Sequence, residues 1–168
     1  MTLKRRSDAS SFDGAHQDSA ISEEKKVILF VCENNTGLSQ MAQAFAEEHG
    51  MKALSAGKYP AAVLSPVVVQ AMKEKNIDLS EKRPTPLTPQ IINDASLVVT
   101  IGCSLKGACP LTILREMQER TIDWDWKGLK GRCIREVREI RDGIERRVVE
   151  LSRDNKLTTR APALIQVK

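Results

Sequence analysis

Aromatic residues, long apolar runs and closely paired cysteines are all scarce in this 168-residue sequence. Aromatic side chains make up 4% of it, too few for a surface on which nucleic-acid bases stack. The net charge of +4 comes from interspersed basic and acidic residues, which does not indicate a nucleic-acid partner either. No apolar run reaches the roughly 20 residues of a membrane-spanning helix. We therefore expect a protein that binds neither nucleic acid nor membrane.

Four cysteines are present, and none lies in a C-x-x-C pair. No apolar run follows the basic residues near the N-terminus, so the start of the chain does not resemble a secretory signal. This cysteine usage favours a reducing compartment, the cytoplasm by default, in which cysteines are catalytic, metal-binding or inert. The length and the 41% hydrophobic content suit one domain with a sizeable core.

Short apolar strands alternate with helices along the chain. Strands are predicted at Val27–Val31, Lys52–Ser55, Leu97–Ile101 and Thr121–Trp124. Helices are predicted from Ser39, from Pro66 to Asn76, over Gln90–Asp94 and over Cys133–Arg153. This order predicts an α/β fold: a single domain with a four-stranded parallel sheet flanked by helices. We expect the domain to span residues 26–154, after a disordered arm (1–25) and before a C-terminal tail (155–168).

The stretch from Lys26 to Glu48 is the best candidate for a functional site. An apolar strand ends at Cys32, a short polar loop follows, and Ser39 opens an apolar-periodic helix. Such a loop directs backbone N–H groups and the positive helix end toward its contents, which favours a reactive thiolate. A buried cysteine that simply packs at a strand end has the same local pattern. The residues alone leave both interpretations open.

This stretch resembles the phosphate-binding loop of the low-molecular-weight tyrosine phosphatases and of the arsenate reductases that share their fold. The family pattern V-C-x-x-N-x-x-R-S, often followed by Q-M-A, is matched at Val31, Cys32, Asn35, Gly37, Ser39, Gln40, Met41 and Ala42. The later stretches SAGKYPA, EKRPTPLT, VVTIGC, ACP and IREVREIRDGIERRV match in order. The resemblance covers roughly Lys26 to Ser152 and points to the arsenate-reductase branch.

The resemblance implies a low-molecular-weight phosphatase-like fold and an anion-binding loop after the first strand. In that loop Asn35 would brace the backbone and Ser39 would stabilise the thiolate. The implied loop residues are Glu33, Asn34, Asn35, Thr36, Gly37, Leu38 and Ser39.

Two family residues are missing from the expected site. Leu38 stands where the family has the arginine that grips the oxyanion, and Gly128 stands where it has the general-acid aspartate. Two charge-assisted hydrogen bonds are worth about 1.5–3 kcal/mol each, so losing the arginine is expected to weaken oxyanion binding or turnover by roughly two to four decades. Glu33 adds a negative charge that repels a dianion. Ordinary phosphatase activity is therefore not expected.

Other residues are candidates to replace the missing groups. Asp123 and Asp125 could supply an acid, and Arg83 and Arg132 could supply a cation. The pattern does not show whether any of the four reaches the loop.

Cys103 and Cys109 lie in the loop after the strand that ends at Ile101. In a parallel sheet this loop leaves at the same edge as the loop after Cys32. The resemblance implies that Cys32 is the nucleophile, that Cys103 or Cys109 resolves its disulfide, and that a thioredoxin-like protein or a small thiol is the reductant. We therefore expect a thiol–disulfide oxidoreductase related to arsenate reductases, with no required cofactor.

Two alternatives stay open. The first is an arsenate reductase or a tyrosine phosphatase in which another cation replaces the loop arginine. The second is an electron-transfer protein that holds zinc or an iron–sulfur cluster on Cys32, Cys103, Cys109 and Cys133, although structural zinc sites usually contain C-x₂₋₄-C pairs.

Overall fold

The computed structural model describes residues 26–157, with side chains up to residue 154. The predicted arm and most of the predicted tail lie outside these residues. The elements are, in chain order, β1 (Val27–Cys32), α1 (Leu38–Glu48), β2 (Lys52–Gly57), α2 (Pro66–Lys73), α3 (Pro89–Asp94), β3 (Leu97–Ile101), α4 (Leu111–Met117), the 3₁₀ turn η1 (Gln118–Arg120), β4 (Thr121–Trp124) and α5 (Ile134–Leu157).

The four strands form one parallel sheet in the order β2-β1-β3-β4. This confirms the predicted sheet, and β1 lies inside it between β2 and β3. Val31 pairs with Ala56 of β2 and with Thr100 of β3. Because the strands are parallel, the loops after β1, β2, β3 and β4 all leave from the same edge.

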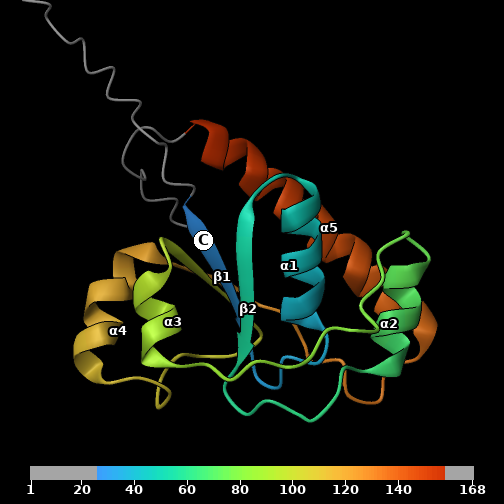
Figure 1. Ribbon diagram of the computed structural model, residues 1–168, viewed down its shortest axis with the longest axis horizontal. Helices are drawn as coiled ribbons and strands as arrows, with labels where there is room; N and C mark the ends of the chain where they lie inside the picture. Colours follow the sequence, from blue (N-terminus) through green and yellow to red (C-terminus); the bar gives the residue numbers. More distant parts are fainter. Residues whose placement is uncertain (1–25, 158–168) are drawn as a thin grey trace, which may run out of the picture.

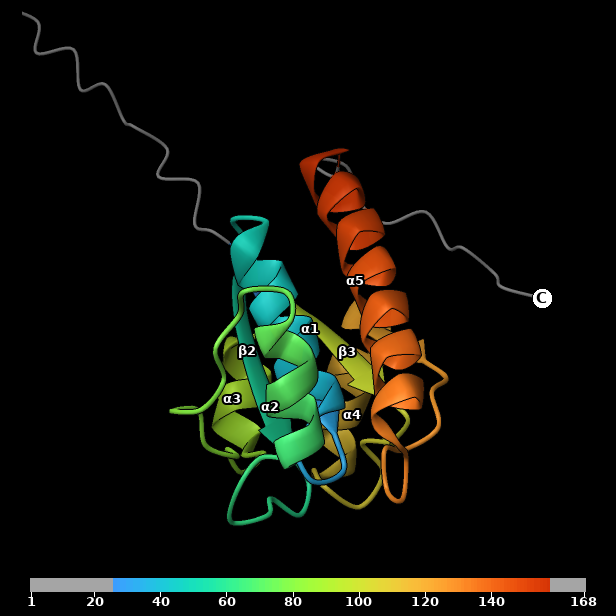
Figure 2. The ribbon, with the colours of Figure 1, turned by 90° about the vertical axis from the view of Figure 1, so that its right-hand side faces the viewer.

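Helices cover both faces of the sheet, as the continuous apolar strands predict. Helices α1, α2 and α5 lie on one side and α3 and α4 on the other (Figures 1 and 2). Alternate residues of β1 face opposite cores: Phe30 and Cys32 belong to the cluster under α1 and α5, whereas Leu29 and Val31 belong to the cluster under α3 and α4. None of the helices within residues 26–157 is long and apolar enough to cross a membrane.

The helices α2, α4 and α5 differ from the sequence prediction. Helix α2 ends at Lys73 rather than Asn76, because Asn76 has a φ of 61° and closes a turn with the Ile77 N–H on the Met72 carbonyl. Helix α4 was not predicted. Met117 is the one residue of this helix that is fully buried, so its sequence shows little of the apolar periodicity that marks a helix. Helix α5 continues to Leu157, past the expected start of the tail.

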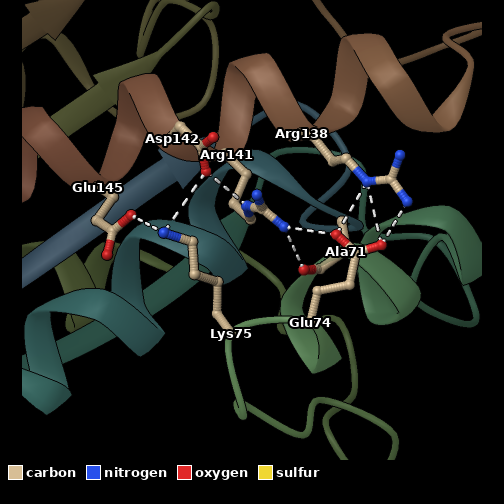
Figure 3. A network of polar contacts seen from close by, with 7 residues as sticks. All are labelled: Ala71, Glu74, Lys75, Arg138, Arg141, Asp142 and Glu145. Carbon is tan, nitrogen blue, oxygen red and sulfur yellow. Dashed lines mark hydrogen bonds and ion pairs between the residues drawn. The ribbon is translucent and has the colours of Figure 1, made fainter.

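Ion pairs and hydrogen bonds connect the end of α2 to α5 (Figure 3). Glu74 accepts three hydrogen bonds of 2.6–3.1 Å from Arg138 and one of 2.9 Å from Arg141. The Arg141 side chain is nearly buried and also donates to the Ala71 carbonyl at 2.7 Å. Lys75 pairs with Glu145 at 2.7 Å. Arg138, Arg141 and Glu145 of α5 therefore belong to the contact between α2 and α5, whereas other charged residues of this helix, such as Arg135 and Glu150, are exposed.

Candidate active site

The sulfur of Cys32 lies at the carboxyl end of β1 and is surrounded by donors from the following loop. The Asn35 backbone N–H donates to it at 3.2 Å, and the Ser39 hydroxyl lies 2.9 Å away. That hydroxyl accepts a hydrogen bond of 2.7 Å from the Asn35 side-chain amide, so its own proton is left to donate to the sulfur. Hydrogen bonds donated to sulfur stabilise a thiolate, so the arrangement suits a nucleophile.

Asn35 is the residue around which the loop is built. It is fully buried and has a φ of 53°, in the left-handed region that asparagine tolerates better than most residues. Its side-chain oxygen accepts hydrogen bonds from the Gln40 amide at 2.9 Å and from the Thr85 backbone N–H at 2.8 Å. The bracing role expected for Asn35 is therefore seen in its contacts, and Gln40 and Thr85 extend it to α1 and to the segment before α3.

The chain that follows β2 supports the other side of the loop. Backbone N–H groups of Lys58, Tyr59, Ala61 and Ser65 donate to the carbonyls of Cys32, Glu33, Asn34 and Thr36. Gly57 packs so closely that a Cβ there would lie 2.8 Å from the backbone of Asn34 and Asn35. Only glycine fits this position without moving the loop.

The remaining loop residues divide into an exposed and a buried group. Glu33 and Asn34 are exposed, and Thr36 is half-buried. Gly37 is buried, and a Cβ there would collide with the Leu129 side chain. The loop therefore presents Glu33 and Asn34 to solvent and packs Gly37 inward.

Leu38 does not point into a polar pocket. It is buried in the apolar core on the α1 side of the sheet, with Trp126 and Leu129 against the same cluster. Leu129 follows Gly128, the position at which the family's general acid was expected. The arginine and the acid loop are thus replaced together by apolar side chains that contact the same core.

None of the four candidate replacements is bonded to the loop through its side chain. The Arg83 guanidinium donates to Ser80 and Lys82 carbonyls, although its own carbonyl accepts from Gln40. Arg132 pairs with Glu136 at 2.9 Å.

The two aspartates are also engaged elsewhere. Asp123 accepts a hydrogen bond of 2.7 Å from Thr100. Asp125 lines a cavity of about 320 Å³ beside α5 together with Trp126 and Glu136. The structure gives no support to either residue as a substitute acid at Cys32.

Cys103 and Cys109 lie on the opposite face of the sheet from Cys32. Both pack against the α3–α4 core, whereas Cys32 belongs to the α1–α5 core. The Cys103 sulfur nevertheless lies 3.5 Å from the carbonyl oxygen of Val31, the residue directly before Cys32. Burial, and then the negative charge of Cys32, raise the pKa of Cys103 to about 11, and burial also raises the pKa of Cys109. Of these two cysteines, Cys103 is the one whose sulfur contacts the end of β1.

Lys58 is a residue of this region that the sequence did not single out. Its ammonium group donates to the Lys106 carbonyl at 3.1 Å, in the loop between Cys103 and Cys109, and its charge lowers the pKa of both thiols. Lys58 directly follows β2, and β2 is the neighbour of β1. That position at the carboxyl edge is the signal that could have identified it.

The alternative of a four-cysteine metal or cluster site is not supported. Within residues 26–157 no three or more histidine, cysteine or acidic side chains are grouped so that they could hold a metal ion. Cys133 is exposed just before α5, where its backbone N–H donates to Glu136 at 2.9 Å. Cys32 packs with the α1–α5 core, whereas Cys103 and Cys109 pack against the α3–α4 core.

Similar proteins agree with this fold. A putative arsenate reductase of Halobacterium salinarum is 36% identical over 133 residues, which are 73% of this chain and 87% of that protein. A thioredoxin-dependent arsenate reductase of Corynebacterium glutamicum superposes with a TM-score of 0.67 at 28% identity, covering 82% of this chain and 65% of that one.

An arginine phosphatase from Geobacillus stearothermophilus superposes with a TM-score of 0.68 at 27% identity and covers 79% of this chain and 94% of that one. The family model described as low molecular weight phosphotyrosine protein phosphatase matches residues 27–160. This match spans the sheet, the Cys32 loop and α5. The chain therefore belongs to the low molecular weight phosphotyrosine protein phosphatase family, and its curated relatives lie in the arsenate-reductase branch.

Proposed function

We propose that this protein is a cysteine-based thiol–disulfide oxidoreductase of the arsenate-reductase type, with Cys32 as the nucleophile and Cys103 as the first resolving thiol. The observation that carries the proposal is the position of the Cys103 sulfur, 3.5 Å from the carbonyl of the residue before Cys32. The donors around Cys32 and its arsenate-reductase relatives support it further. A reducing compartment, the cytoplasm, suits chemistry that starts from free thiols.

The proposed reaction is a sequence of thiol–disulfide exchanges. The Cys32 thiolate attacks a substrate disulfide R–S–S–R, forms the mixed disulfide Cys32–S–S–R and releases R–S⁻. The Cys103 thiolate then attacks the Cys32 sulfur, so that a Cys32–Cys103 disulfide forms and the second R–S⁻ leaves. Cys109 attacks Cys103 in turn, which frees Cys32. An external dithiol reduces the Cys103–Cys109 disulfide, and two electrons pass from that dithiol to the substrate.

Electrostatics favours this order of events. The negative charge of Cys32 is one cause of the high pKa of Cys103. When Cys32 becomes part of a mixed disulfide, it is neutral and no longer opposes ionisation of Cys103. The first attack thus removes one obstacle to the second.

Arsenate reduction is the second candidate substrate reaction, and the curated relatives favour it. Cys32 would attack the arsenic(V) of arsenate, and an oxygen ligand would leave as water, which gives a Cys32–arsenic bond. Cys103 would then attack the Cys32 sulfur, the sulfur–arsenic bond would break, and its electron pair would leave with arsenic as arsenite, arsenic(III). This route needs a grip on the oxyanion, which Leu38 does not provide. It therefore depends on backbone N–H groups and a cation elsewhere, whereas the disulfide route does not. By analogy with the Corynebacterium relative, whose name records thioredoxin dependence, we propose a thioredoxin-like protein as the reductant for either route.

Coupled turnover assays on the full chain test the proposal. Thioredoxin, its reductase and NADPH would drive reduction of a small-molecule disulfide and, separately, of arsenate. Cys32→Ser is expected to abolish turnover of whichever substrate is reduced. Cys103→Ser is expected to stop the cycle after one attack, with the Cys32 adduct visible in the protein mass. The matched control is Cys133→Ser, at an exposed cysteine outside the site. Full turnover by Cys32→Ser would overturn the proposal.

A further inference from the structure

Lys58 bridges the two loops that carry the cysteines. Its backbone N–H donates to the Cys32 carbonyl at 3.3 Å. Its ammonium group donates to the Lys106 carbonyl at 3.1 Å, within the loop between Cys103 and Cys109. The two ends of this one residue thus contact segments that are more than 70 positions apart in the sequence.

The position of Lys58 is fixed by its neighbours. Gly57, directly before it, packs against the backbone of Asn34 and Asn35, and the next residue, Tyr59, donates its N–H to the Glu33 carbonyl. The Lys58 ammonium also lies 5.9 Å from the centre of the Tyr59 ring. A lysine side chain held at both ends loses the freedom that normally weakens its interactions at a surface.

The groups facing the two thiols are mostly unfavourable to a thiolate. Cys103 is faced by Cys32 from β1 and by Asp123 from β4, which both disfavour its ionisation. A backbone hydrogen bond with Ile101 and then the charge of Lys58 favour its ionisation. Cys109 is disfavoured by burial and favoured by Lys58. Lys58 is thus the side chain whose charge lowers the pKa of both thiols, against the rise that burial causes. Thiol exchange proceeds through the thiolate, so this charge acts on the reactive form of each.

We propose that Lys58 is a positioning residue for the resolving step: its ammonium group holds the Cys103–Cys109 loop against the Cys32 loop and stabilises the thiolates that attack there. In that step Cys103 loses its proton to solvent, its sulfur bonds to Cys32, and the bond between Cys32 and the substrate sulfur breaks. Cys109 then attacks Cys103 in the same way. The role in a resolving step rests on the proposed function. The effect of Lys58 on the two thiols can be measured without any substrate.

The test is alkylation of the reduced full chain by iodoacetamide, followed for each cysteine by peptide mass spectrometry as a function of pH. Lys58→Met is expected to slow alkylation of Cys103 and Cys109 about three- to tenfold near neutral pH, because the charge that lowers the pKa of both thiols is removed. Lys58→Arg, which keeps the charge, is expected to restore most of the rate. Exposed Cys133 serves as the internal reference and is expected to keep its rate.

Lys106→Met is the matched control. It removes a positive charge from the same loop but leaves the backbone carbonyl that binds Lys58. If Lys58→Met leaves both pH profiles unchanged, or if Lys106→Met shifts them equally, the assignment is overturned. Because no substrate is present, this result is independent of whether Cys32→Ser abolishes turnover.

Salt provides a second measurement on the unmodified protein, which does not depend on any variant folding. Iodoacetamide is neutral, so salt changes the fraction of each thiol that is ionised and not the rate at which the reagent meets the thiol. Raising the ionic strength from about 0.05 M to about 1 M shortens the screening length to about 3 Å and is expected to slow alkylation of Cys109, where the charge that acts on the thiol is that of Lys58, relative to Cys133. Relative rates independent of salt would count against Lys58.

Discussion

The sulfur of Cys103 lies 3.5 Å from the carbonyl oxygen of Val31, the residue directly before Cys32. The relationship follows from the sheet, because β1 and β3 are adjacent parallel strands that end at the same edge. Cys32 and Cys103 pack into opposite cores, so their sulfurs approach the strand end from the two faces. A disulfide between them would therefore close across the end of β1.

Cys103 is expected to react slowly with alkylating agents near neutral pH. Burial and the charge of Cys32 raise its pKa to about 11, so about 0.1% of it is thiolate at pH 8 and its rate should rise about tenfold per pH unit from there. Cys32→Ser removes one of the causes and should speed Cys103 alkylation at fixed pH. The measurement is peptide-resolved alkylation, with Cys133 as reference. An unchanged Cys103 rate in Cys32→Ser would show that the two thiols are not coupled.

Ser39→Ala is expected to slow alkylation of Cys32 by about 10- to 100-fold at pH 7. The Ser39 hydroxyl lies 2.9 Å from the sulfur, and a hydrogen bond to a charged group is worth about 1.5–3 kcal/mol. The control is Ser152→Ala, at a buried serine of α5 that bonds to the Val149 carbonyl. If both variants react at Cys32 like the unmodified protein, the Ser39 hydroxyl does not stabilise the thiolate.

The sheet and the loop that follows Cys32 could be predicted from the sequence because their signals are local. The apolar runs of β1 and β3 mark buried strands, and the spacing from Cys32 to Ser39 marks the loop. The four-stranded parallel order is confirmed. The resemblance implied that Asn35 braces the loop, and its side chain does hydrogen-bond to Ser39, Gln40 and Thr85.

Contacts between distant segments could not be predicted in the same way. Lys58 reaches Lys106 through a side chain whose direction depends on how two loops pack, and no local pattern records that. The same holds for Arg83 and Arg132, which were candidates for the missing cation by charge alone and are bonded elsewhere. The ion pairs of Glu74 with α5 could not be predicted either, because the alternating charges of α5 are typical of an exposed helix.

Asn35→Ala is expected to reduce the free energy of unfolding by about 3 kcal/mol. It removes the partners of Gln40 and of the Thr85 N–H in a fully buried place, and each orphaned group costs about 1–3 kcal/mol. Asn35→Gly loses the same hydrogen bonds but adopts the φ of 53° without strain, so it should be the more stable of the two by about 1 kcal/mol. Urea unfolding measures both. Equal stabilities would mean that the backbone conformation at residue 35 is unstrained.

Leu38→Arg tests whether only the charge of the anion loop was lost. The variant should bind phosphate, detected as protection of Cys32 from alkylation, because an arginine at this position supplies two charge-assisted hydrogen bonds. It should also lose about 2 kcal/mol of stability, since Leu38 is buried beside Leu129 and a guanidinium must leave that core. Leu38→Met, an apolar control of similar volume, should give no protection. Failure of Leu38→Arg to bind phosphate would mean that Trp126 and Leu129 close the site to anions.

Glu74→Gln is expected to lower stability at pH 7 and to lose that effect in acid. Hydrogen bonds from Arg138, followed by those from Arg141, lower the pKa of Glu74 from 4.5 to about 2. A lowered pKa means that the folded state binds the proton more weakly than the unfolded state, so the contribution is complete above about pH 4.5 and disappears as the pH falls through 2. The difference between the two proteins in urea unfolding should therefore be largest at neutral pH and shrink from pH 4.5 to 2. The control is Glu48→Gln, at an exposed carboxylate at the end of α1. A Glu74→Gln effect that stays constant with pH would assign the loss to packing of the side chain, because only the ionised carboxylate holds the two arginines of α5.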